Sequence, residues 1–145
     1  MSRWEETTTI SAPAEKIFPF VGDMTRHGEW GGHGLQATKT GDGPVGVGTK
    51  YATTAKQFGT QREQSTLTDL IPPTKVAWDS VGALGTVHHW VTLSEQGGST
   101  VVQKGAEMVA PKFLAKMTMF KLKKDIPAGL RSDLANIKAK AEGSA

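Results

Sequence analysis

One histidine and one glutamate, on separate predicted strands, form the residue pair best suited to acid–base chemistry. In the segment 87–93 the apolar residues occupy every second position, and His89 shares their inward face. The same alternation turns Glu63 inward together with Leu67 and Ile71. Histidine titrates near neutral pH, so His89 can exchange a proton with a substrate while Glu63 orients it. The alternative is a structural histidine, buried and hydrogen-bonded to Glu63 or to the backbone.

The remaining histidines and the glycine-rich segments do not have the pattern of a metal or phosphate site. His88 adjoins His89 on one strand, so the two side chains point to opposite faces. His27 and His33 flank a glycine-containing segment without helical i, i+4 spacing, and the chain has no cysteine. The segment 41–48 is rich in glycine but lacks the Gly-Lys-Ser/Thr ending of a phosphate-binding loop. We therefore expect no metal and no cofactor.

The elements that position these residues fall into three parts of the chain, because the secondary-structure signals change twice along it. The β-branched residues of segment 4–10 predict a strand, Pro13 favours a helix start, and Asp23 is suited to cap a second short helix. Turn signals then separate six predicted strands. These strands span 35–40, 49–56, 61–71, 75–81, 87–95 and 100–109.

The last third of the chain has helical periodicity. Its apolar residues recur mostly three or four positions apart, which predicts one long helix with an apolar face. That face comprises Phe113, Met117, Phe120, Leu130, Leu134, Ile137 and Ala141. Pro127 and Gly129 lie within it, so we expect a kink or a break there.

Composition fits a single globular domain over residues 1–145. The mass is 15.5 kDa, 37% of the residues are hydrophobic, and no apolar run approaches the ~20 residues of a membrane span. No secretory signal is recognisable at the start, and with cysteine absent we expect a cytoplasmic protein. The formal charge of +3 comes largely from lysines in 112–124, without a nucleic-acid reading motif, so nucleic acid is not an expected partner.

Four segments resemble the START-like (SRPBCC) superfamily. They are 10–18 (ISAPAEKIF), 45–51 (VGVGTKY), 69–78 (DLIPPTKVAW) and 97–102 (GGSTVV). This resemblance implies an α+β helix-grip fold, in which a curved antiparallel sheet of about seven strands surrounds a long C-terminal helix. Two short helices follow the first strand. Bacterial members are grouped as polyketide cyclase/dehydrase and lipid-transport proteins.

A helix-grip fold implies a cavity between sheet and helix, lined by alternate strand residues and one helix face. We expect its ligand-binding residues to be Trp30, Tyr51, Trp78, Val91, Phe113, Met117 and Phe120. Trp30 follows the short helices in a glycine-flanked loop, where it can cover the cavity mouth or act as a packing residue.

Two functions remain open from the sequence. The first is a cytosolic binding protein for a small, mostly apolar ligand resembling a lipid or a polyketide. The second is a polyketide cyclase or dehydratase in which His89 moves the proton, Glu63 orients it, and Tyr51 or Arg62 lies near a developing oxyanion. For the lysines of 112–124 we weigh a solvated helix face against weak contact with an anionic membrane. Monomer and homodimer are both compatible with the sequence.

Overall fold

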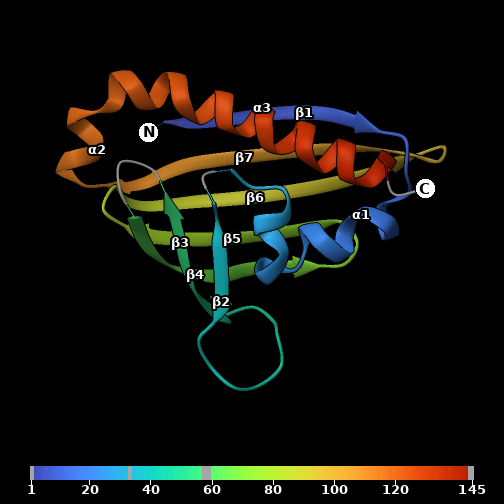
Figure 1. The fold of residues 1–145 in the computed structure, drawn as a ribbon, viewed down its shortest axis with the longest axis horizontal. Helices are drawn as coiled ribbons and strands as arrows, with labels where there is room; N and C mark the ends of the chain where they lie inside the picture. Colours follow the sequence, from blue (N-terminus) through green and yellow to red (C-terminus); the bar gives the residue numbers. More distant parts are fainter. Residues whose placement is uncertain (1, 33, 57–59, 144–145) are drawn as a thin grey trace.

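The structure is a computed structural model, and it describes residues 2–32, 34–56 and 60–143. Seven strands and three α-helices, with one 3-10 helix, follow the predicted order (Figure 1). The strands are β1 (Arg3–Ile10), β2 (Gln36–Lys39), β3 (Lys50–Lys56), β4 (Thr60–Ile71), β5 (Lys75–Gly82), β6 (Gly85–Gln96) and β7 (Ser99–Pro111). The helices are α1 (Ala14–Val21), η1 (Met24–Glu29), α2 (Phe113–Met117) and α3 (Met119–Gly143).

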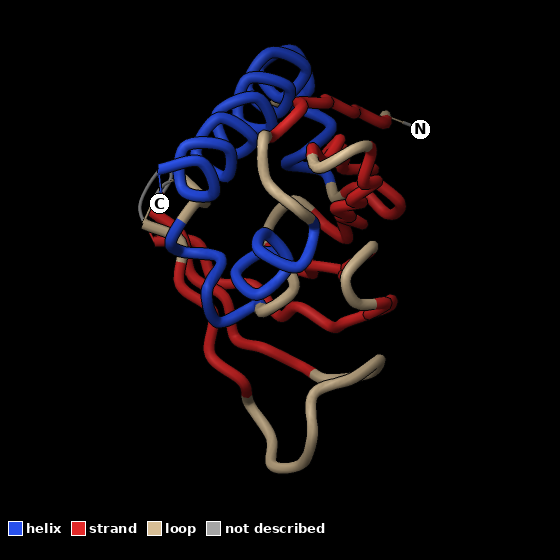
Figure 2. Tube along the Cα trace, turned by 90° about the vertical axis from the view of Figure 1, so that its right-hand side faces the viewer, coloured by secondary structure: helices blue, strands red, loops and turns tan. Residues whose placement is uncertain are grey.

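All neighbouring strands pair antiparallel in one sheet of order β1-β7-β6-β5-β4-β3-β2. The first strand therefore pairs with the last, while the other strands follow one another as a meander. The sheet curls around the helices, and α3 runs across its concave face (Figure 2). This is the predicted helix-grip fold of the α+β class.

A β-bulge in β4 corrects one predicted side-chain direction. The register shifts between Leu67 and Asp69, so the strand has one extra residue at that point. Leu67 is buried as predicted, but Ile71 is 53% exposed. Beyond the bulge it is Leu70 that packs against the core. The prediction that Ile71 points inward is therefore wrong, because an inserted residue inverts the alternation of all later positions.

Local signals at the helix starts agree with the structure. The side chain of Asp23 accepts a hydrogen bond from the Thr25 amide at 2.9 Å, as a cap of η1. Pro13 occupies the N-cap position of α1. Of the kink or break expected at Pro127 and Gly129, the break is not formed, since α3 continues through both residues. The interruption lies instead at Thr118, between α2 and α3.

Two groups of buried residues attach the helices to the sheet. The larger joins α1, η1 and the second half of α3 to the strands, and includes Ile17, Leu134 and Ile137. The smaller joins α2 and the first half of α3 to β6 and β7 around Ala115 and Met108. None of the described helices is long and apolar enough to cross a membrane.

Trp90 and Gly105 form a tightly packed cross-strand pair on the outer face of the sheet. They are opposite each other in β6 and β7, and a Cβ atom at position 105 would overlap the Trp90 indole. On the same face the Arg3 guanidinium lies 4.3 Å from the centre of the Trp90 ring. Glycine is needed here because the flat ring lies directly on the neighbouring backbone.

Gly105→Ala is therefore expected to lower the free energy of unfolding by about 1–3 kcal/mol, because the indole must move to admit a methyl group. Urea unfolding followed by circular dichroism measures the change. Gly41→Ala is the matched control, since a Cβ there meets no atom within 4 Å. Equal stability of the two variants would contradict the packing role of Gly105.

Candidate functional site

A cavity of about 480 Å³ lies between the concave face of the sheet, the η1 region and α3. Its walls come from every element from η1 to β7 and from the middle of α3. The lining residues are Met24, His27, Trp30, Gly31, Gly32, Leu35, Ala37, Thr53, Ala55, Glu63, Ser65, Trp78, Ser80, His89, Lys104, Gly129, Ser132 and Asp133. The volume is within the range of small-molecule sites.

Aromatic rings form one wall of the cavity, with Trp78 at its centre. The His89 ring stacks on Trp78 with centroids 5.2 Å apart and planes at 13°. His27 contacts Trp78 and Trp30, at centroid distances of 4.9 and 4.6 Å. Trp30 is buried and donates a hydrogen bond from Nε1 to the Phe20 carbonyl at 3.0 Å. Trp30 is thus a packed wall residue, the second of the two roles considered for it.

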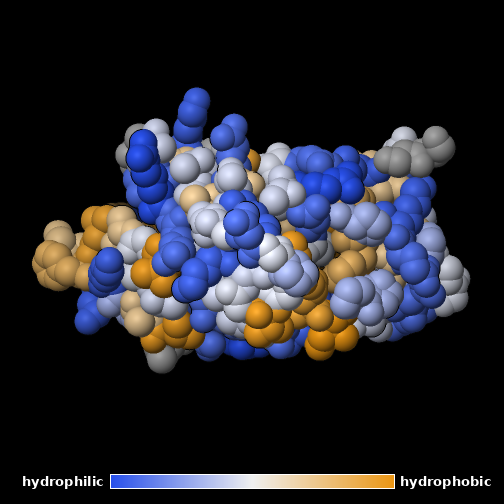
Figure 3. Space-filling model, turned by 90° about the horizontal axis from the view of Figure 1, so that it is seen from below, coloured by the Kyte–Doolittle hydropathy of each residue, from blue (hydrophilic) through white to orange (hydrophobic). Residues whose placement is uncertain are grey.

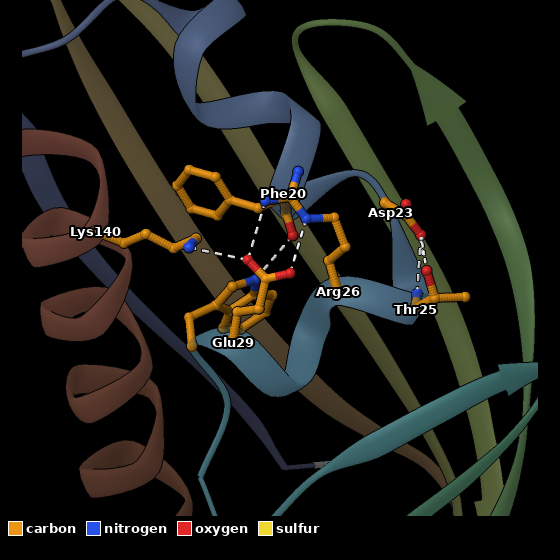
Figure 4. A network of polar contacts seen from close by, with 7 residues as sticks. Phe20, Asp23, Thr25, Arg26, Glu29 and Lys140 are labelled. Atoms are coloured by element: carbon orange, nitrogen blue, oxygen red, sulfur yellow. Dashed lines mark hydrogen bonds and ion pairs between the residues drawn. The ribbon is translucent and has the colours of Figure 1, made fainter. Parts of the chain in front are cut away.

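A surface network fastens the η1 end of the cavity to α3 (Figure 4). Arg26 donates to both carboxylate oxygens of Glu29, at 2.8 and 3.0 Å, and Lys140 reaches from α3 to Glu29 at 2.9 Å. These bonds lower the pKa of Glu29 to about 2. Asn136 of α3 also donates to the Trp30 carbonyl at 3.0 Å. The network holds η1 against the helix and so keeps Trp30 in place.

His89 and His27 are neutral at neutral pH because both rings are removed from water. Burial, with a smaller contribution from the Lys104 charge, lowers the pKa of His89 to about 3. Its Nδ1 is buried and has no hydrogen-bond partner among the described residues. Burial likewise lowers the pKa of His27 to about 4. His27 Nε2 lies 2.7 Å from the Val21 carbonyl and must carry the proton, since a carbonyl only accepts.

Glu63 lines the cavity but is not beside His89. Glu63 pairs with Thr53 of β3, whereas His89 lies opposite Trp78, whose partner in β4 is Leu67. The level of Glu63 along the sheet is thus four residues from that of His89, roughly 13 Å at ~3.3 Å per residue, and β5 lies between their two strands. No hydrogen bond joins them within the described part of the chain. The direct Glu63–His89 contact considered above is not formed, and burial raises the pKa of Glu63.

Hydroxyl groups form a row across three strands near Glu63. Thr53 Oγ1 lies 3.2 Å from Ser65 Oγ, which lies 3.0 Å from Ser80 Oγ. Thr53 also donates to the Glu63 carbonyl at 3.1 Å. All three side chains are buried and line the cavity. The three hydroxyl groups therefore make this end of the cavity polar, and none of them carries a formal charge.

A buried ion pair, absent from the sequence-based expectations, lies at the α3 side of the cavity. Lys104 Nζ of β7 is 3.3 Å from Asp133 Oδ2 of α3, and both side chains line the cavity. The signal was present in the sequence, because Lys104 alternates with the inward residues Val102 and Ala106. A lysine at an inward position of a buried strand is unusual unless it is paired.

The other predicted ligand contacts divide into two groups. Tyr51 and Val91 are buried in the main core and support the lining without belonging to it, and Arg62 is exposed. Phe113, Met117 and Phe120 are 75%, 60% and 81% exposed and lie outside the cavity. Their predicted direction is wrong.

The physical reason is a second apolar stripe in the same helical segment. Ala115, Met119, Leu122 and Ile126 pack on the sheet, and their spacing continues into Leu130, Leu134, Ile137 and Ala141. Phe113, Met117 and Phe120 do not share the helical spacing of this stripe and therefore lie on another face. The uninterrupted stripe from 115 to 141 was the signal that would have identified the buried face.

The histidines form no metal site among the described residues, which hold no group of three or more candidate ligands. His88 lies on the outer face, with Nδ1 2.6 Å from Asp79 Oδ1, opposite in direction to His89. His33, considered with His27 above, lies outside the described residues.

The lowered histidine pKa values predict a loss of stability in mild acid. The unfolded chain takes up protons near the ordinary histidine pKa of ~6.5, while folded His89 does not until pH ~3, so stability falls as pH drops below 6.5. Between pH 7 and pH 5, His89 is expected to contribute about 1–2 kcal/mol to this loss. In His89→Phe, which retains a ring on Trp78, the loss should be smaller by that amount in urea unfolding. An unchanged pH dependence would contradict the buried, neutral state of His89.

Solved structures share this fold at low sequence identity. Protein CV1439 from Chromobacterium violaceum superposes with a TM-score of 0.76 at 14% identity, covering 98% of this chain and 99% of that chain. TTHA0849 from Thermus thermophilus gives 0.75 at 12%, covering 99% of each chain. The di-domain ARO/CYC protein StfQ from the steffimycin biosynthetic pathway gives 0.69 at 16%, over 96% of this chain and 44% of that chain. At these identities the likeness concerns the fold alone.

No functionally curated protein matches the sequence significantly. The sequence itself matches one family over residues 1–142, nearly its whole length. Fold, cavity and sequence match agree, and the chain belongs to the family described as polyketide cyclase / dehydrase and lipid transport.

Proposed function

We propose that the protein binds a small, mostly apolar ligand, resembling a lipid or a polyketide, in the cavity between the sheet and α3. The observation that carries this proposal is the 480 Å³ cavity itself, whose lining combines apolar residues such as Trp30, Trp78 and Leu35 with polar side chains. Apolar walls with a small number of convergent polar groups are typical of small-molecule sites. The membership of the family supports the same interpretation, and the cytoplasmic location stays a prediction.

An enzymatic role is the second candidate, and His89 is the residue that favours it. The His89 imidazole lines the cavity, where it can hydrogen-bond to a reacting oxygen, and the fold is shared with StfQ. Glu63 would act at the other end of the cavity rather than on His89. Turnover of a poly-β-ketone that is lost in His89→Phe, with ligand binding retained, would favour the enzyme over the binding protein.

Filling the cavity tests the binding proposal. Ala55→Phe adds a ring to the lining of β3, and we expect it to weaken binding of the neutral probe N-phenyl-1-naphthylamine by roughly tenfold or more, because the ring occupies the site. Probe fluorescence measures the affinity. Ala52→Phe, exposed on the same strand, is the matched control and should bind as the wild type. Equal binding by both variants, or no binding by the wild type, would refute the proposal.

We propose further that the segment 112–124, here called the α2 tip, contacts anionic membranes. It presents Phe113, Leu114, Met117 and Phe120 to solvent at the end of the molecule formed by α2 (Figure 3). Its lysines are Lys112, Lys116, Lys121, Lys123 and Lys124, and no acidic residue interrupts them before Asp125. Exposed aromatic residues among lysines fit the interface of an anionic bilayer. Lys121 is paired with Asp125 at 3.6 Å, and the positive charge of the other four lysines opposes self-association through the same surface.

Vesicle sedimentation tests this contact. We expect binding to phosphatidylserine-containing vesicles at low salt. Lys116→Gln/Lys123→Gln/Lys124→Gln should weaken it roughly a hundredfold, since each lysine contributes about 1 kcal/mol. Phe113→Ser/Phe120→Ser should weaken it as well, because it removes exposed apolar side chains. Lys16→Gln/Lys50→Gln/Lys56→Gln, on exposed positions elsewhere, removes the same charge and is the control. Binding lost equally in the control would point to net charge alone, and no sedimentation of the wild type would refute the contact.

A further inference from the structure

Apart from Glu63 at the other end, the charged groups of the cavity are gathered around one lysine. Lys104 is 5% exposed, and its Nζ lies 5.8 and 6.0 Å from the ring centres of Trp30 and Trp78. A lysine ammonium has three N–H donors. One is directed to Asp133 Oδ2 at 3.3 Å, and within the described residues Nζ makes no hydrogen bond to a carbonyl or hydroxyl oxygen. Lys104 thus retains donor capacity inside an apolar cavity.

His89 adds a second donor beside Lys104. Their strands are neighbours, with His89 opposite Ala106 and Val91 opposite Lys104, so the two inward side chains are diagonal neighbours on one face. A neutral imidazole carries one ring proton. Because buried N–H groups without partners are rarer than buried acceptors without partners, the orphaned Nδ1 indicates that the proton is on Nε2. The His89 ring therefore brings one N–H donor into the cavity wall.

The charge of Asp133 determines which kind of ligand oxygen Lys104 and His89 can bind favourably. It already balances the Lys104 charge, so a ligand carboxylate would bring a second, uncompensated negative charge beside Asp133. A neutral carbonyl oxygen accepts from both donors without adding charge. A hydrocarbon leaves the donors without acceptors, which costs free energy in a buried site.

We propose that the cavity selects ligands with a neutral carbonyl oxygen, bound by Lys104 and His89, with Asp133 rejecting acids and the rest of the ligand lying against Trp78 and Trp30. This inference rests on the proposed binding function. Lys104 is its specificity-determining residue, and Asp133 is the residue that sets the charge of the site.

Three ligands of one shape test this selectivity by isothermal titration calorimetry. They are 2-acetylnaphthalene, a neutral ketone, 2-isopropylnaphthalene, a hydrocarbon, and 2-naphthoate, a carboxylate. The wild type should bind the ketone roughly tenfold tighter than either of the others, the size of one hydrogen bond to a charged donor. Lys104→Met, which keeps the length of the side chain, should reduce the preference for the ketone over the hydrocarbon to less than about threefold.

Asp133→Asn supplies a variant with the opposite expected effect. With the lysine charge uncompensated, affinity for 2-naphthoate should rise roughly tenfold, while affinity for the hydrocarbon stays unchanged. A folding defect would weaken all three ligands and cannot produce this gain. Near-ultraviolet circular dichroism checks the packing of the tryptophans in each variant.

The outcomes separate this inference from the function on which it rests. Equal affinity of the wild type for ketone and hydrocarbon, or an Asp133→Asn variant that gains nothing for the carboxylate, would overturn carbonyl selection while leaving apolar binding intact. If the wild type binds none of the three ligands and does not bind N-phenyl-1-naphthylamine either, the binding function and the inference are overturned together.

Discussion

The concave face of the sheet is covered by α1, η1 and the helical segment of α2 and α3, and the rest of the structure depends on how far this cover extends. The apolar stripe of α2 and α3 packs on the sheet at two places, around Ala115 and around Ile137. Beside its buried stripe, α3 contributes the small residues Gly129 and Ser132 to the cavity lining. The cavity remains where these helices do not fill the concave side of the curved sheet.

Polar groups survive inside this cavity because almost every one of them has a partner. Lys104 is paired with Asp133, the three hydroxyls bond one another, and His27 donates to a backbone carbonyl. Burying a polar group without a partner is costly, which makes His89 exceptional. The Nε2–H of His89, together with the donors of Lys104, makes this end of the cavity polar. The proposed ligand preference and the candidate enzymatic role both originate there.

On the surface of the molecule, the α2 tip combines exposed apolar residues with a cluster of lysines. The apolar residues of the α2 tip that do not pack on the sheet remain in solvent beside five lysines. One stripe of this segment serves the core and the other has no partner in the described structure. An amphipathic segment with two apolar stripes is unusual for a helix whose only role is packing.

Local chemistry determined much of this protein from sequence alone. The order of strands and helices, the cap at Asp23, the inward direction of Trp78 and His89 and the outward direction of His88 all depend on neighbouring residues and strand alternation. Tertiary structure decided what local patterns leave open. A single inserted residue in β4 turned Ile71 outward, and strand register placed Glu63 four residues from the level of His89. Packing kept α3 continuous through Pro127 and selected the stripe of Ala115 over that of Phe113. Periodicity predicts which residues share a face. Only contact with the rest of the chain decides which face is buried, because apolar surface is removed from water only where two elements meet.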